Sequence, residues 1–330
     1  MKNISIIGDG AMGSVCAILL CEKGFTVRMW GYDAQQLSQF EKRGENLKFL
    51  PGYKLPKALV FEPEDSEILK GAELIISAVP CQYMRSVWQR LKNYVRGSVP
   101  IVSVTKGIEN GTLLRPSEIL SDVIHKNIKV VTFSGPTIAD ELVRKLPATA
   151  TAACVDERLA GAVQEIFSTP YFRIYRNSDI IGVELAGAMK NVIAIAAGIV
   201  DGIKAGDNTK AALLCRGLAE ITRLGVVMGA KEQTFAGLSG LGDLVTTCIS
   251  PMGRNRIFGQ RIGAGVTVKE ALETTESVVE GVDTCKSVID LARKYAVNMP
   301  ITEAVYQILF EGKSVAAAIE ELMARKLKAE

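Results

Sequence analysis

The chain has 330 residues, of which 48% are hydrophobic and 23% are charged, and a formal net charge of +3 at pH 7. This length exceeds what one hydrophobic core usually supports, so it favours two domains, and the composition excludes a disordered or collagen-like chain. The small net charge, without a block of consecutive basic residues, gives no electrostatic footprint for a nucleic acid, and we expect no nucleic-acid partner.

In the first half of the chain, short runs rich in β-branched residues alternate with helical patterns. Such alternation predicts βαβ units, and therefore an α/β Rossmann domain with a doubly wound, mainly parallel sheet. The expected strands are Ile4–Ile7, Thr26–Trp30, Leu59–Phe61, Leu74–Val79, Ile101–Val104, Val130–Phe133 and Thr149–Val155, and the strand pattern fades after Tyr171–Tyr175. The expected helices between them include Met12–Lys23, Cys81–Val95 and Arg158–Phe167.

From Asp179 onward, nearly every segment has a helical pattern. The expected helices are Ile180–Asp201, Lys210–Met228, Arg254–Ile262, Val282–Tyr295, Thr302–Phe310 and Val315–Lys326. Because Asn, Ser and Asp cap helices, we place the domain boundary at Asn177-Ser178-Asp179. The sequence therefore predicts a dinucleotide-binding Rossmann domain over residues 1–178 and an all-α substrate-binding and catalytic domain over residues 179–330.

The longest apolar stretch, Val183–Val200, is interrupted by Glu184, Lys190 and Asn191. These polar residues favour a buried core helix over a membrane span. The first ten residues contain only a short apolar run and no secretory signal, so we expect a cytoplasmic protein.

Glycines in the order of a dinucleotide-binding loop follow the first expected strand. Gly8-Asp9-Gly10-Ala11-Met12-Gly13 has the G-x-G-x-x-G spacing and leads directly into a helix. Gly8 allows the tight turn, Gly10 lets the backbone approach a pyrophosphate, and Gly13 lets the helix pack closely on the strand. The alternative is a glycine-rich turn that binds nothing.

The end of the second strand usually reports whether the cofactor is NAD or NADP, because an acidic residue there accepts a hydrogen bond from the ribose 2′-hydroxyl. Here the segment is Trp30-Gly31-Tyr32-Asp33. Asp33 fits that role and fits equally well as the cap of the next helix. NAD and NADP therefore both remain candidate cofactors.

Two segments of the first domain place polar residues directly after strands, where open α/β sheets bind their ligands. Lys106 follows the strand that ends in Ser103-Val104, and Ser134-Gly135-Pro136-Thr137 follows the next strand and leads into the helix Ile138–Lys145. A solvated surface lysine and an ordinary turn are the alternatives.

Lys190 is the only charged residue between Glu184 and Asp201, in a helix of otherwise apolar and small residues. Burial, together with a second ammonium from Lys106, predicts that the pKa of Lys190 is lowered toward the working pH, which would suit it for proton transfer. The alternative is a lysine whose ammonium reaches solvent. The only histidine, His125, is expected to be exposed near a helix end, and we expect neither a histidine base nor a metal site.

Glycines also precede Asp243, in the loop Gly237-Leu238-Ser239-Gly240-Leu241-Gly242, and predict that the loop presents this carboxylate. A helix cap is the alternative for Asp243. Arg254 and Asn255 follow a loop that contains Pro251 and Gly253, at an expected helix start that could grip a phosphate. Solvated side chains are the alternative for this pair.

Together, these motifs resemble the bacterial-type NAD(P)-dependent glycerol-3-phosphate dehydrogenases over nearly the whole chain. The motifs that carry the resemblance are the glycine loop, Thr105-Lys106-Gly107, Ser134-Gly135-Pro136, Lys190-Asn191, Gly240-Leu241-Gly242-Asp243-Leu244, Arg254-Asn255-Arg256 and Val278-Val279-Glu280-Gly281-Val282. The resemblance implies an active site in the cleft between the Rossmann domain and a helical domain, and reversible hydride transfer between sn-glycerol 3-phosphate and dihydroxyacetone phosphate. It also implies a role in supplying glycerol 3-phosphate for phospholipid synthesis, with a second copy of the chain as a candidate partner.

The resemblance assigns roles to individual positions. Lys190 would be the general base, Lys106 a contact to both substrate and cofactor, and Asp243 a polar partner of the substrate or of Lys190. The residues that would hold the substrate, besides these three, are Gly135, Thr137, Gly253, Arg254 and Asn255. The residues that would contact the cofactor, besides Lys106, are Gly8, Gly10, Ala11, Met12, Gly13, Tyr32, Ala139, Arg254, Val278 and Glu280. Met12, Tyr32, Thr137 and Gly253 depart from the residues that are common at these positions in the family.

Two other functions remain as alternatives. The glycine loop and the Lys190-Asn191 helix also resemble the β-hydroxyacid dehydrogenases, although Ser134–Thr137 lacks the paired glycines of that family's substrate loop. A regulator that binds a dinucleotide without turning it over would leave Lys190 without a role.

Overall fold

The computed structural model of the protein describes residues 1–97, 99–275 and 278–327. It divides into two units. The first unit consists of Met1–Lys106 and Leu114–Glu184, and the second of Gly107–Leu113 and the chain from Leu185 onward. The division thus lies a few residues beyond the boundary that we predicted after Ser178, and it adds a short segment of the first half to the second unit.

The first unit is built on one eight-stranded sheet with the order β3-β2-β1-β4-β5-β6-β7-β8. The neighbouring strands pair in parallel, except that β7 runs antiparallel to β6. The strands are β1 (Asn3–Ile7), β2 (Thr26–Trp30), β3 (Val60–Phe61), β4 (Leu74–Ser77), β5 (Ile101–Ser103), β6 (Val130–Ser134), β7 (Ala148–Ala153) and β8 (Phe172–Asn177). The chain order turns back beside β1, between β1 and β4, which confirms the doubly wound, mainly parallel Rossmann sheet.

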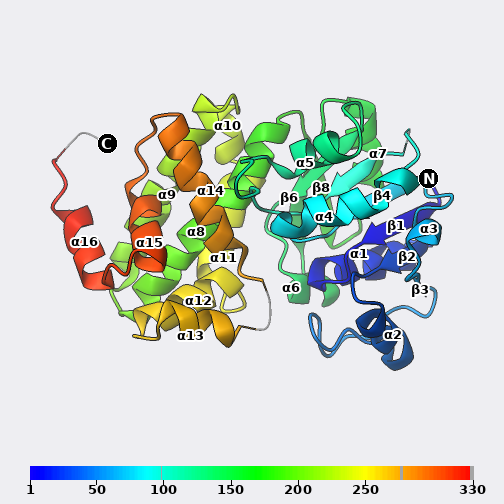
Figure 1. The fold of residues 1–330 in the computed structure, drawn as a ribbon, viewed down its shortest axis with the longest axis horizontal. Helices are drawn as coiled ribbons and strands as arrows, with labels where there is room; N and C mark the ends of the chain where they lie inside the picture. The colour runs from blue at the N-terminus through cyan, green and yellow to red at the C-terminus, as the bar shows by residue number, and fades with distance from the viewer. Residues whose placement is uncertain (98, 276–277, 328–330) are drawn as a thin grey trace. The chain divides into compact units, whose positions relative to one another are not determined.

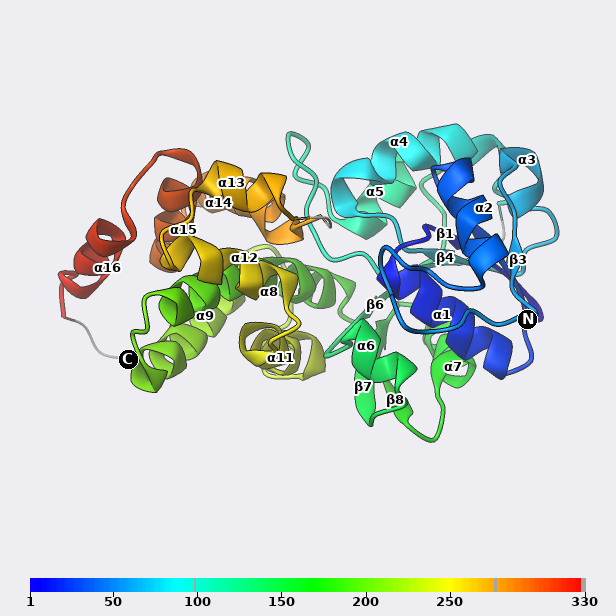
Figure 2. The same ribbon diagram turned by 90° about the horizontal axis from the view of Figure 1, so that it is seen from below.

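Helices cover both faces of this sheet. They are α1 (Ala11–Glu22), α2 (Ala34–Arg43), α3 (Asp65–Ile68), α4 (Cys81–Leu91), η1 (Lys92–Tyr94), α5 (Pro116–Val123), α6 (Ala139–Val143) and α7 (Glu157–Phe167). Figures 1 and 2 show α1 and α7 on one side of the strands and α4 and α5 on the other. Two apolar clusters fill the two layers, because alternate strand residues such as Ile6 and Ile7 point to opposite faces of the sheet.

Polar caps mark the starts of two helices of this unit, and a glycine marks the end of one. Asp33 and Asp156 accept hydrogen bonds from backbone N–H groups in the first turns of α2 and α7, and Gly44 ends α2 in the left-handed conformation. The predicted exposure of His125 was wrong. It follows the end of α5 and is half-buried, with its Nε2 atom inside the protein.

The second unit is helical, as predicted. Its helices are the main part of α8 (Ile180–Gly202), then α9 (Asp207–Val227), α10 (Glu232–Phe235), the π-helical turn η2 (Leu238–Gly242), α11 (Asp243–Ile249), α12 (Arg254–Gly263), α13 (Val268–Glu273), α14 (Glu280–Lys294), α15 (Pro300–Phe310) and α16 (Val315–Met323). By length and composition α8 could cross a membrane, but 89% of its most apolar 18-residue stretch is buried inside the protein. It is therefore the core helix that the sequence predicted.

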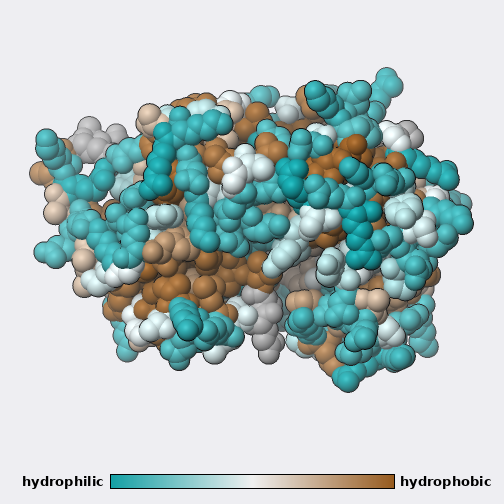
Figure 3. Space-filling view, in the orientation of Figure 1, coloured by the Kyte–Doolittle hydropathy of each residue, from teal (hydrophilic) through white to brown (hydrophobic). Residues whose placement is uncertain are grey.

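Glycines bring α8 and α12 into close contact. A Cβ atom on Gly198 of α8 would lie 2.0 Å from the carbonyl oxygen of Arg256, and one on Gly259 of α12 would lie 2.0 Å from the carbonyl oxygen of Ile195. Neither helix could approach the other this closely with a larger residue at these positions. On the face in Figure 3, hydrophobic residues gather over part of the second unit.

The segment Gly107–Leu113 packs with the helices although it follows β5 in the chain. The hydroxyl of Ser287 in α14 donates to the carbonyl oxygen of Ile108 at 3.1 Å and contacts Oδ1 of Asn110 at 2.6 Å. These contacts assign the segment to the second unit.

Candidate active site

The glycine loop between β1 and α1 has the geometry of a dinucleotide cradle. Gly8 has a φ angle of +113°, and a Cβ atom there would lie 2.6 Å from the carbonyl oxygen of Ala78 in the chain after β4. A Cβ atom on Gly13 would lie 2.1 Å from the carbonyl oxygen of Gly8. Around Gly10, by contrast, no atom of the described residues, apart from its chain neighbours, lies within 4 Å of the corresponding point.

These three environments match the three requirements of the motif. Gly8 makes the turn, Gly13 lets α1 pack against the loop, and Gly10 leaves open space before the first backbone N–H groups of α1. Ala11 and Met12, the predicted cofactor contacts that follow, are the first two residues of that helix. No side chain caps the helix at Gly10, so its N-terminus can receive a pyrophosphate.

At the end of β2, Asp33 serves as a helix cap. Its carboxylate accepts hydrogen bonds from the backbone N–H groups of Gln35 at 2.9 Å and Gln36 at 3.2 Å. Of the two roles that the sequence left open, the capping role is the one observed. Tyr32, a predicted cofactor contact, is 72% exposed.

Lys106 lies beside the segment that follows β6, as the sequence predicted from their positions after neighbouring strands. Its ammonium donates to the carbonyl oxygen of Gly135 at 2.9 Å and lies 3.5 Å from the hydroxyl oxygen of Thr137. The lysine is half-buried, which is inconsistent with a simple solvated surface residue. Ala139, another predicted cofactor contact, begins α6 directly after this segment.

Lys190 is buried in α8, with 5% of its surface exposed. Its Nζ atom donates to Oδ1 of Asp243 at 2.6 Å and to the hydroxyl oxygen of Thr247 at 2.5 Å. The ammonium therefore does not reach out to solvent, and it has a carboxylate and a hydroxyl for partners. The lowered pKa that we predicted for Lys190 stays a prediction.

The predicted glycine-rich loop before Asp243 is the π-helical turn η2. A Cβ atom on Gly240 would lie 2.0 Å from the carbonyl oxygen of Phe235, so the turn can pack against α10 only with glycine there. Asp243 follows as the first residue of α11 and is 2% exposed. Its carboxylate pairs with Lys190, which gives Asp243 a role other than the helix cap that was the alternative. Thr247 lies four residues later on the same face of α11.

Asn255 links three helices of the second unit. Its side-chain amide donates to Oδ1 of Asn191 in α8 at 3.0 Å and accepts from the backbone N–H of Gly281 in α14 at 2.9 Å. Asn191 and Asn255 are both buried. The pair therefore fixes the start of α12 beside the residue that follows Lys190.

Arg254 begins α12 after Gly253, which has an extended conformation at the cap position. Its side chain is exposed, and its Nη1 atom donates to the carbonyl oxygen of Val278 at 3.2 Å. Glu280 begins α14 two residues later. Within the second unit, the structure thus brings Arg254 beside the segment that carries the predicted cofactor contacts Val278 and Glu280.

Sequence reasoning missed two members of this constellation. Thr247 was not proposed, although its i+4 spacing from Asp243 on a helix was a usable signal. Asn191 was noted only as part of a motif. Its hydrogen bond to Asn255 joins residues 64 positions apart, which no local sequence pattern predicts.

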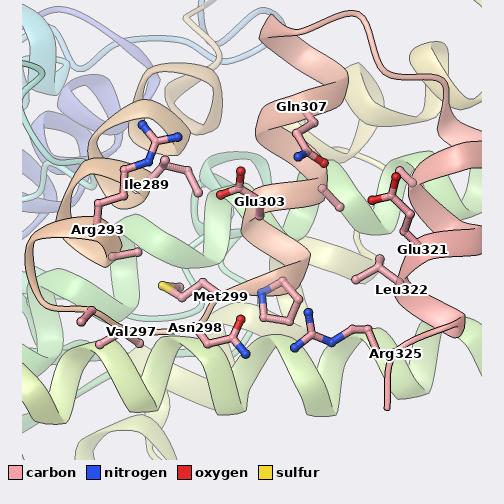
Figure 4. Close-up of a pocket in the computed structure, with 15 residues that line it drawn as sticks. Ile289, Arg293, Val297, Asn298, Met299, Glu303, Gln307, Glu321, Leu322 and Arg325 are labelled. Atoms are coloured by element: carbon pink, nitrogen blue, oxygen red, sulfur yellow. The ribbon is translucent and has the colours of Figure 1, made fainter.

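A cavity of about 460 Å³ lies in the second unit between α14, α15 and α16. Figure 4 shows Arg293, Glu303, Glu321 and Arg325 around it, together with apolar residues such as Met299. None of the predicted site residues lines this cavity. Among the described residues, no group of three or more His, Cys, Asp and Glu side chains could hold a metal ion.

A Rossmann unit with an open glycine cradle, and a helical unit with a buried lysine and aspartate pair, together define a dinucleotide-dependent dehydrogenase. Comparison with known families makes this class specific. The N-terminal and C-terminal domains of NAD-dependent glycerol-3-phosphate dehydrogenase match residues 3–160 and 179–320 of the chain. The chain belongs to the NAD-dependent glycerol-3-phosphate dehydrogenase family.

Individual relatives support the same family assignment. The glycerol-3-phosphate dehydrogenase [NAD(P)+] of Citrifermentans bemidjiense is 46% identical, over 100% of this chain and 99% of the relative. That of Geobacillus thermodenitrificans is 43% identical, over 100% of this chain and 97% of the relative. The crystal structure of glycerol-3-phosphate dehydrogenase from Coxiella burnetii has a TM-score of 0.95 and 37% identity, and covers 98% of this chain and 99% of that one. These matches favour this family over the β-hydroxyacid dehydrogenases.

Proposed function

We propose that the chain catalyses reversible hydride transfer between sn-glycerol 3-phosphate and dihydroxyacetone phosphate, with Lys190 moving the proton at the C2 oxygen. The family makes the chain an oxidoreductase with NAD or NADP as its cofactor. The observation that best supports the role of Lys190 is its burial against Asp243 and Thr247, because a buried ammonium held by two partners is positioned for proton transfer.

The nicotinamide, when bound, supplies or accepts the hydride. In the direction of ketone reduction, the ammonium of Lys190 donates a proton to the oxygen at C2, and in the reverse direction its amine accepts that proton. Asp243 and Thr247 hold Nζ in one place, so the ammonium needs little reorientation during the reaction. The carboxylate of Asp243 also stabilises the charged form that donates.

The other predicted residues act through charge and position. The ammonium of Lys106 stabilises the negative charge that develops on the C2 oxygen, and the carbonyl oxygen of Gly135 positions that ammonium. Arg254 is exposed at a helix start, where its guanidinium and the nearby N–H groups suit a phosphate. Asn255 supports this helix start through its bonds to Asn191 and Gly281.

The physiological direction that we propose is reduction in the cytoplasm, which supplies glycerol 3-phosphate for phospholipid synthesis. A homodimer is part of the same proposal. Analytical ultracentrifugation of the purified chain at several concentrations distinguishes a monomer from a dimer.

The test is to add dihydroxyacetone phosphate to the purified chain with NADH and, separately, with NADPH, and to follow the absorbance of the reduced nicotinamide. A substrate-dependent decrease is expected with at least one cofactor. A panel of β-hydroxy acids with the oxidised cofactors is expected to give no comparable rate. Nucleotide binding without any turnover would favour the dinucleotide-sensing alternative and contradict the proposed function.

A further inference from the structure

The carboxylate of Asp9, the second residue of the glycine loop, lies against the chain at the end of β2. A Cβ atom on Gly31, the first residue after β2, would lie 2.6 Å from Oδ2 of Asp9. The carboxylate therefore occupies the space beside Gly31 that a side chain would otherwise fill. In dinucleotide-binding sheets, the carboxyl end of this strand is where the 2′ position of the adenosine ribose is recognised.

Asp9 is held in this position by its neighbours. Nε2 of Gln36 in α2 donates to Oδ2 of Asp9 at 2.7 Å, and Nζ of Lys48 donates to Oε1 of Gln36 at 3.0 Å. The side-chain amide of Asn46 donates to the backbone carbonyl of Asp9 at 2.8 Å, which fixes the loop itself. Because both the backbone and the carboxylate are held, the negative charge has a defined place.

The environment of this carboxyl group also resists further negative charge. Burial raises the pKa of Asp9 above its ordinary value, while the hydrogen bond from Gln36 and the charge of Lys48 lower it. The carboxylate of Asp33 adds a repulsive contribution. A second anion at this place would therefore meet two carboxylates.

Three basic side chains of this region are each bound by protein groups. Arg28 of β2 donates to the backbone carbonyls of Glu67, at 2.7 Å, and Lys70. Arg90 pairs with Asp65 at 2.5 Å and lies over the rings of Trp30 and Tyr32, at 5.1 and 5.6 Å from their centroids. Lys48 is bound to Gln36, as described above.

A 2′-phosphate would have to share these cations with the protein groups that already bind them, whereas a 2′-hydroxyl needs only an acceptor. NADP therefore requires an available cation in this part of the first unit, and NAD requires a hydrogen-bond acceptor.

We propose that Asp9 makes the chain select NAD(H) over NADP(H), by accepting a hydrogen bond from the ribose 2′-hydroxyl and repelling a 2′-phosphate. The acidic group that determines specificity thus comes from the glycine loop, because the aspartate after β2 is used to cap α2. This inference rests on the proposed function only in so far as the chain binds a dinucleotide, and it makes no use of the chemistry at Lys190.

The test measures binding rather than turnover. Isothermal titration calorimetry of the full chain with ADP-ribose and with 2′-phospho-ADP-ribose compares two ligands that lack the nicotinamide. The wild-type chain is expected to bind ADP-ribose at least about tenfold more tightly, given the repulsion between a carboxylate and a phosphate at close range. Asp9→Asn keeps an oxygen for Gln36 and removes the charge, so it is expected to reduce this ratio by about tenfold or more.

Asp33→Asn is the matched control, because asparagine also caps helices and the substitution removes a carboxylate from the same region. Its effect on the ratio is expected to be smaller than that of Asp9→Asn. Equal or tighter binding of 2′-phospho-ADP-ribose by the wild-type chain would overturn the proposal, and so would an Asp9→Asn ratio that is unchanged or matched by Asp33→Asn.

The wild-type ratio decides the question even if Asp9→Asn fails to fold, and Asp9→Ser then provides a second variant without the carboxylate. If the ratio behaves as expected but dihydroxyacetone phosphate is not reduced, only the proposed catalytic function is contradicted.

Discussion

The glycine cradle of the first unit and the lysine site of the second unit are built in different ways. In the cradle, three glycines within six residues let the backbone pack closely at Gly8 and Gly13 and leave open space at Gly10. The lysine site instead depends on side chains from separate helices, with Lys190 in α8 meeting Asp243 and Thr247 in α11. The cradle is thus sensitive to added atoms, and the lysine site is sensitive to lost partners.

The largest effect that this comparison predicts is at Lys190. Lys190→Ala is expected to lower the turnover of dihydroxyacetone phosphate by roughly 10²–10⁴-fold, because it removes the proton donor that we propose. Binding of ADP-ribose should survive, since the cradle belongs to the first unit. Steady-state kinetics and calorimetry measure the two effects separately.

Lys313→Ala is a suitable control, because it removes another lysine of the second unit that pairs with a carboxylate, Glu321, and that has no proposed role in the site. Its turnover should stay near that of the wild type. Turnover of Lys190→Ala within about tenfold of the wild type would remove Lys190 from the mechanism.

The cradle can be tested with one methyl group at two positions. Gly10→Ala adds a Cβ atom where none of the described residues, apart from its chain neighbours, has an atom within 4 Å. The fold should therefore be unaffected, while ADP-ribose binds roughly ten- to a hundredfold more weakly. Gly13→Ala places its Cβ atom 2.1 Å from the carbonyl oxygen of Gly8, so it should also destabilise the protein, by about 1–3 kcal/mol.

Urea unfolding and calorimetry on both variants make the comparison. Equal losses of stability in the two variants would show that the open space at Gly10 has a structural role, and the cradle interpretation would be wrong.

The contrast between the two regions also explains what could be predicted from the sequence. The strands and the glycine loop were predictable because each depends on residues that are close in the chain, and β1, β2 and β5 lie within a few residues of their predicted limits. The short helices α3 and α10 were missed, because four residues span only about one helical turn, and an apolar spacing that does not repeat cannot be recognised.

In the site, the burial of Lys190 was predictable because one charge in a long apolar helix is unusual. Its pairing with Asp243 depends on how α8 and α11 pack, over 53 residues of separation, and only the family resemblance suggested it. The specificity role that we propose for Asp9 was not predictable either. It depends on a contact with Gly31, which belongs to a different strand.

A smaller effect is expected at Thr247, the partner of Lys190 that the sequence did not reveal. Thr247→Val removes the hydroxyl and should lower kcat by about tenfold, which corresponds to one lost hydrogen bond, with little change in KM. Thr247→Ser restores the hydroxyl and should recover most of the activity. A Thr247→Ser variant as slow as Thr247→Val would indicate a packing role instead of a positioning role.

The smallest predicted effect concerns Glu220 in α9, a buried carboxyl group of the second unit. It accepts hydrogen bonds from the backbone N–H groups of Ile301 and Thr302 at the start of α15, at 2.7 and 3.1 Å. Burial nevertheless raises its pKa above the ordinary value of 4.5. The folded state therefore holds this proton more strongly than the unfolded state does. The stability that the group contributes is complete below about pH 4.5 and is lost as the pH rises through the folded pKa.

Glu220→Gln removes the ionisation and keeps one oxygen for the N–H groups. Its free energy of unfolding relative to the wild type should therefore improve between pH 4.5 and 7, by an amount of about 1 kcal/mol, which is typical of single substitutions. Urea unfolding of both proteins across this range measures the difference. If the difference in unfolding free energy stays constant with pH, the N–H groups of α15 compensate the buried charge of Glu220 fully. Backbone groups would then satisfy a buried carboxylate in this unit as well as side-chain partners satisfy Lys190.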